Sequence, residues 1–317
     1  MKFYMCWLFV VVSLFWIPSA HGWGMATHIL MAEQAMNRQD PEVFLGSMMA
    51  DFNQAAFDDA DLNAAISQLT HYEFDRLDDS WFAMGIATHN NVWGTDWFSH
   101  QYWLPDIPES EWYYSTQKIN QLAEELNISL LEAEYYFEMA VELLLRVDTG
   151  PDLGNKILWA TTTFNSAHLA SLIEGFAEPL SESMAGMTLL EAEKTLQNKA
   201  RLFQRMLQGY GLAYVEGELA LANLLTAVGV FYLNEKPLWV AYNLRYAVEL
   251  CRDDYRAELD RVSDILKLEL DVHYPHKMEE NVWGCRASED KTSPASLVPL
   301  LMLGILLKPC FRQHKIK

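Results

Sequence analysis

Residues 82–100 read FAMGIATHNNVWGTDWFSH, and the fold prediction starts from this stretch. It opens with apolar residues of the kind that fill a buried helix, and it then places His89, Asp96 and His100 at intervals of seven and four. At about 100° per residue, steps of seven and eleven residues return to within about 20° of the starting direction. A continuous helix would therefore carry all three side chains on one face, which predicts a helical protein with metal-ligand chemistry on a buried surface.

The spacing leaves two interpretations of this stretch open. Asp96 and His100 stand at i and i+4, where two side chains can bind one ion. On a straight helix His89 lies roughly 10 Å from Asp96, too far to share that ion. Either two ions lie along one face, or the backbone breaks between His89 and Asp96. The Asn90–Asn91 pair and Gly94 favour a break, since both residue types disrupt helices.

The first 22 residues have the pattern of a secretory signal. Lys2 precedes an apolar run that ends at Ile17, and Ala20 and Gly22 are the small residues of a cleavage site. The apolar run is shorter than the roughly 18–20 residues of a spanning anchor. We therefore expect export to the periplasm, the cell surface or the medium, with Trp23 as the new N-terminus.

Composition and charge narrow the classes of partner. The chain is 51% hydrophobic and 21% charged, with a net charge of −20, so duplex nucleic acid and anionic membrane are disfavoured as electrostatic partners. Of its four cysteines, Cys251 and Cys285 are free to pair in an oxidising compartment, and no CxxC motif occurs. A metal site would therefore depend on carboxylates and on the histidines between the signal and residue 200, which are His28, His71, His89, His100 and His168. The alternative is a core helix with hydrogen-bonded histidines.

Apolar periodicity predicts an all-α fold. We expect a helical core over residues 23–180, further helices packed on it over 181–280, and a linker, a short apolar segment and a basic tail over 281–317. Within the core the pattern predicts helices at Met25–Met36 and Asp152–Glu174, and a capping box at Ser129 opens another. Residues 186–272 predict two or three long helices. The apolar segment 297–307 is a candidate for membrane association.

Four short segments carry a family resemblance. They are WGMATH (23–28), FLGSMMAD (44–51), LTHY (69–72) and the run 89–100. Together they resemble the zinc-dependent phospholipase C family and the related fungal single-strand nucleases. The resemblance implies two or three zinc ions. It also implies that Trp23 binds zinc through its free α-amino group and carbonyl oxygen, and the implied ligands from side chains are His28, Asp51, His71, His89, Asp96 and His100.

The chain departs from the family pattern at two places. The family has Asp four residues after its His, where Trp93 stands here, and Asp96 comes three residues later. The family closes its site with a His and an acid four residues on, but His168 is followed at that distance by Leu172. His168 is the expected ligand, completed by Asn165 or by Glu138 or Glu142 from an earlier helix, although these glutamates also fit a solvated face. A two-metal variant stays open.

The implied reaction is hydrolysis of a phosphoester by zinc-activated water, with Asp51 orienting or deprotonating that water. A phospholipid substrate is the first expectation, and a single-strand nuclease-like phosphodiesterase is the alternative. Two further alternatives are a non-catalytic exported protein that retains a partial metal site and a helical interaction protein whose histidines are incidental.

Overall fold

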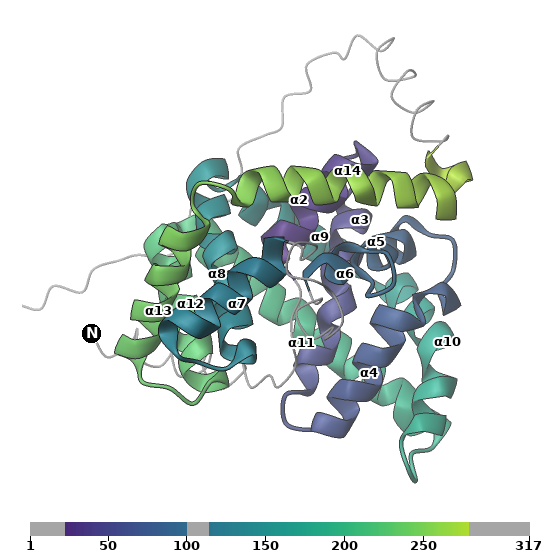
Figure 1. Ribbon diagram of the computed structural model, residues 1–317. Coiled ribbons are helices and arrows are strands. Elements are labelled where there is room, and N and C mark those ends of the chain that lie inside the picture. The colour runs from purple at the N-terminus through teal and green to yellow at the C-terminus, as the bar shows by residue number, and fades with distance from the viewer. Residues whose placement is uncertain (1–22, 100–113, 279–317) are drawn as a thin grey trace, which may run out of the picture.

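The computed structural model describes residues 23–99 and 114–278, and its elements are helices with no strand among these residues, which confirms the all-α prediction. The first half of the chain forms short helices and two 3₁₀ segments around a common centre (Figure 1). In order they are α2 (Met25–Met36), α3 (Pro41–Met49), η1 (Ala50–Ala56), α4 (Ala60–Tyr72), η2 (Phe74–Arg76), α5 (Trp81–His89), α6 (Thr95–Ser99), α7 (Tyr114–Leu126), α8 (Leu130–Thr149) and α9 (Asp152–Thr163).

The second half consists of helices of 15 to 28 residues that pack on the first. They are α10 (Ser166–Ser183), α11 (Leu189–Glu216), α12 (Glu218–Tyr232), α13 (Pro237–Cys251) and α14 (Tyr255–His273). Helix α11 packs along α9 and α10, α13 along α8, and α14 crosses over α2 (Figure 1). Within the described part of the chain, we find no helix with the length and apolarity needed to cross a bilayer.

Several helices begin directly after residues whose side chains can cap a helix. Asp40, Asp59 and Ser80 each accept a backbone N–H of the first turn of α3, α4 and α5. Ser129 and Glu132 form the predicted capping box at the start of α8. These caps fix where α3, α4 and α5 begin, and therefore where their later residues point.

Glycine allows α3 and α5 to cross at close range. A Cβ atom on Gly46 would collide with the carbonyl oxygen of Phe82 and lie 2.9 Å from the Cα of Gly85. The two helices share more neighbouring residues than any other pair of elements in the described chain. This close crossing brings the backbone of Ser47 up to His89.

Several predictions from the sequence are wrong in detail. The expected helix Asp152–Glu174 is two helices, because Asn165 accepts the backbone N–H of Ala167 and starts α10. Residues 186–272 hold four helices, α11 to α14, rather than two or three. Cys251 is buried, and its pairing with Cys285 stays a prediction because Cys285 lies outside the described residues.

Candidate metal centre

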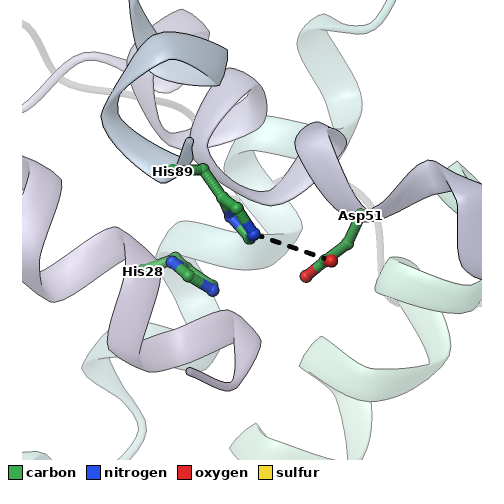
Figure 2. A group of neighbouring side chains, drawn as sticks. All are labelled: His28, Asp51 and His89. Atoms are coloured by element: carbon green, nitrogen blue, oxygen red, sulfur yellow. Dashed lines mark ion pairs between the residues drawn. The ribbon is translucent and has the colours of Figure 1, made fainter. Parts of the chain in front are cut away.

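Five predicted ligands meet at the centre of the first half. His28 comes from α2, Asp51 from η1, His71 from α4, His89 from α5 and Asp96 from α6, and each side chain is buried. Figure 2 shows three of them, with the rings of His28 and His89 on one side and the Asp51 carboxylate facing them. We call these five residues the central cluster.

The distances within the central cluster are short and form a pattern. Asp51 Oδ1 lies 3.6 Å from the Nε2 atoms of both His71 and His89. Asp96 Oδ2 lies 3.4 Å from His71 Nε2 and 3.2 Å from His89 Nε2. The other oxygen of Asp96, Oδ1, faces His28 Nε2 at 3.8 Å. The two carboxylates thus close a ring with His71 and His89, and Asp96 also extends toward His28.

In His71 and His89, the ring nitrogen that faces away from the carboxylates contacts a backbone carbonyl oxygen. His89 Nδ1 lies 2.9 Å from the carbonyl oxygen of Ser47, and His71 Nδ1 lies 3.0 Å from that of Ser67. A carbonyl oxygen only accepts, so Nδ1 carries the proton in the neutral ring and the lone pair lies at Nε2. A metal-binding histidine usually donates the N–H of its other ring nitrogen to a carbonyl oxygen or a carboxylate in this way.

The chain breaks between His89 and Asp96, which decides between the two interpretations of the opening stretch. Helix α5 ends at His89 and α6 begins at Thr95. The Oδ1 atom of Asn90 accepts the backbone N–H groups of residues 92, 93 and 94, and this Asx-type turn folds the chain back. His89 and Asp96 therefore meet within one cluster, although a straight helix would separate them.

Helix α2 is fixed by a carboxylate from a distant helix. Glu142 on α8 accepts the backbone N–H groups of Ala26 and Thr27 and the hydroxyl of Thr27, and it also accepts the phenol of Tyr210. It thereby takes the place of a capping side chain, since Gly24 at the N-cap has none. A Cβ atom on Gly24 would collide with Glu142, so the glycine leaves room for the cap that orients His28.

The electrostatics of the cluster couple the charge of its histidines to its two carboxylates. Burial and the neighbouring His89 lower the pKa of His28 to about 3, and these two rings stack with centroids 3.8 Å apart. Burial also opposes protonation of His71, but the carboxylates of Asp51 and Asp96 outweigh it and raise its pKa to about 10. Without another cation, protonated imidazoles must balance two buried carboxylates, and His28 contributes no charge.

The spacing of nitrogen and oxygen donors in the cluster suits a zinc-like ion. Ligand atoms about 2.0–2.1 Å from a zinc ion in tetrahedral geometry lie about 3.3–3.4 Å from one another. The four nitrogen–oxygen distances among Asp51, His71, His89 and Asp96 range from 3.2 to 3.6 Å. Among the described residues, the triplets whose donors lie close enough to hold one ion are His28–Asp51–His89 and His71–His89–Asp96. An imidazole and carboxylate set of this spacing suits zinc-like ions better than magnesium.

Trp23 lies beside the cluster. Its indole Nε1 donates to the carbonyl oxygen of Thr95 at 3.2 Å, and the hydroxyl of Thr95 lies 3.1 Å from His28 Nδ1. Trp23 and His28 are therefore both tied to the residue that precedes Asp96. The N-terminal ligand hypothesis stays a prediction.

Two predicted ligands are not brought to the cluster by the described structure. His100 lies outside the described residues. His168 lies in the first turn of α10, where its Nδ1 accepts the backbone N–H of Asn165 at 3.2 Å and its Nε2 lies 3.7 Å from Glu42. That hydrogen bond uses the Nδ1 lone pair, and neither candidate triplet contains His168. The solvated-face interpretation of Glu138 and Glu142 is wrong, because both are buried.

Compared with protein-family models, curated proteins and solved structures, the chain matches none. Membership of the zinc-dependent phospholipase C family therefore stays a prediction from the four sequence segments.

Proposed function

We propose that the protein is a metal-dependent phosphoester hydrolase whose principal ion is held by Asp51, His71, His89 and Asp96. The observation that carries the proposal is the arrangement of the two histidines. Both direct Nε2 at two buried carboxylates, and both are tied at Nδ1 to a backbone carbonyl. Zinc is the ion that this donor set favours.

Asp51 is the proposed residue that orients or deprotonates the attacking water. When bound, a zinc ion lowers the pKa of a water molecule toward about 7 and draws charge from phosphoryl oxygens. Asp51 uses Oδ1 toward the two histidines, and its Oδ2 has no hydrogen-bond partner among the described residues. This second oxygen is the one proposed to accept a proton from the attacking water.

A second ion is proposed between Asp96 and His28. One imidazole nitrogen binds one ion, so His89 completes the principal site and His28 is left for another. Asp96 faces that side with Oδ1, and the α-amino group and carbonyl oxygen of Trp23 would supply the remaining ligands after signal cleavage. A third ion would need His100 or His168, and the described structure adds no support for it.

The substrate proposed first is a phospholipid, and a single-stranded nucleic acid is the alternative phosphodiester. Export, and membrane association through residues 297–307, are part of the same proposal. The competing hypothesis is a non-catalytic exported protein that keeps the cluster for stability.

The test is intact mass, metal content and hydrolysis measured on protein exported with its own signal. We expect a chain that starts at Trp23, two or three zinc ions per chain, and hydrolysis of bis(p-nitrophenyl) phosphate that a chelator abolishes and zinc restores. Bound zinc without hydrolysis would favour the non-catalytic hypothesis. A chain that binds no zinc at micromolar concentrations would contradict the metal centre itself.

One residue added before Trp23 separates the two proposed ions. The extension removes the α-amino ligand but leaves the four ligands of the principal ion in place. We expect one zinc ion per chain to be lost, with little change in thermal stability. Full zinc content in the extended protein would contradict the N-terminal ligand.

A further inference from the structure

A cavity lies between the start of α2, α8 and α12, and its lining includes sequence neighbours of the central cluster. Its walls come from the start of α2, from η1, α8 and α11, and from α12, which contributes Leu224, Leu225, Val228 and Tyr232. Most of the lining is apolar. Leu224, Val228 and Tyr232 are only partly buried, so the cavity reaches the surface along α12.

Two walls connect this cavity to the cluster. Gln54 stands three residues after Asp51 on η1, and side chains three apart on a 3₁₀ helix lie above one another. Trp23 and Gly24 form another wall, and the carbonyl oxygen of Gly24 accepts the backbone N–H of His28. The cavity wall therefore shares η1 and the start of α2 with the central cluster.

Glu138 is a polar group of the cavity that the fold leaves unused. Its side chain is 1% exposed, and neither carboxyl oxygen has a hydrogen-bond partner among the described residues. The phenols beside it are engaged, because Tyr135 donates to the carbonyl oxygen of Leu225 and Tyr210 donates to Glu142. A buried carboxyl without a partner costs stability, so a bound donor would relieve that cost.

We infer that this cavity binds a small apolar group that carries a hydrogen-bond donor, a hydroxyl or an amine, and that Glu138 accepts that donor. Its role as a substrate subsite rests on the proposed hydrolase. There it would hold the alcohol portion of the phosphoester and select alcohols that bear a second hydroxyl or an amine. The binding of the group itself requires no metal.

The volume limits the size of the group. The cavity measures about 80 Å³. An engineered cavity of about 150 Å³ holds benzene, with six carbons, so about three or four carbons fit here. Each buried carbon should strengthen binding about fourfold, which corresponds to about 0.8 kcal/mol. The gain should stop once the chain exceeds four carbons.

The probe is 4,4,4-trifluorobutan-1-ol, and fluorine NMR measures its binding to the exported, metal-free protein. Its isomer 3,3,3-trifluoropropyl methyl ether has the same number of atoms but lacks the donor, and it serves as the matched ligand. We expect the alcohol to bind about fivefold or more tightly than the ether, as expected for one hydrogen bond. Val228→Trp should fill the cavity and weaken the alcohol at least tenfold, whereas Val147→Trp, on the exposed face of α8, should not.

Two further variants keep the outcome clear. Val228→Phe fills less of the cavity if the tryptophan variant does not fold, and Glu138→Leu should remove the preference for the alcohol over the ether. Equal binding in wild type and both Val228 variants, or an unchanged preference in Glu138→Leu, would overturn the inference. Because the probes contain no phosphate and the protein no metal, failure of the hydrolase proposal would leave this result readable.

Discussion

In His89 the Nδ1 atom lies 2.9 Å from the carbonyl oxygen of Ser47, whereas in His168 the Nδ1 atom accepts the backbone N–H of Asn165 at 3.2 Å. Both side chains are buried. The first contact places the ring proton on Nδ1 and leaves the Nε2 lone pair for a ligand. The second uses a lone pair to cap a helix, and the neutral ring then carries its proton on Nε2. The contact behind the ring, rather than burial or residue type, separates a candidate ligand from a structural histidine.

Removing Asp96 should break the centre most completely. Asp96 is the carboxylate that faces His71 and His89 with one oxygen and His28 with the other. Asp96→Asn should weaken zinc binding more than about 100-fold, beyond the usual cost of losing an outer-shell partner, and should abolish phosphodiester hydrolysis. Zinc content after dialysis and a chelator competition measure the loss.

Asp152→Asn is the matched control, because Asp152 is also an acid in the first turn of a helix but is exposed. It should keep full zinc content and rate. If Asp96→Asn retained both as well, the assignment of the central cluster as a metal centre would be wrong.

The residues of the cluster were predictable from the sequence, but their supports were not. His28, Asp51, His71, His89 and Asp96 were all named from short segments, and the structure brings them together. The break that joins the last two depends on local hydrogen bonds of Asn90, which explains why the sequence favoured it without deciding it.

Glu138 and Glu142 show where sequence reasoning fails. Together with Glu134 they repeat every four residues along α8, a pattern that fits a charged surface equally well. Their burial depends on α2, α11 and α12, which lie far from them in the sequence. The structure places His168 at a helix start rather than in the cluster for a related reason, since Asn165 three residues earlier is a helix cap, and the triple threonine before it ends α9.

The crossing of α3 and α5 should be the next most sensitive feature, since it brings Ser47 to His89. In Gly46→Ala the added methyl group meets backbone atoms of Phe82 and Gly85, which cannot move aside as a side chain can. We expect a loss of about 3 kcal/mol in the free energy of unfolding, together with weaker zinc binding as the Ser47 contact lengthens. Denaturant unfolding with and without zinc measures both effects.

The control for that crossing is Gly209→Ala on α11, where a new Cβ meets nothing within 4 Å. Alanine is the better helix former, so this change should stabilise the protein by about 0.5–1 kcal/mol. A similar gain in Gly46→Ala would mean that the two helices can separate without cost.

The smallest effect should come from His168→Gln, compared with His89→Gln. Glutamine at the third position of α10 can still accept from the backbone of Asn165, so the cap survives and stability should change by less than about 1 kcal/mol. Zinc content should stay at the wild-type value, because His168 contributes no free lone pair to the cluster. His89→Gln should lose the principal ion, since the amide is a poor zinc ligand. Loss of an ion in His168→Gln would instead show that His168 binds metal after all, and that its helix cap opens to do so.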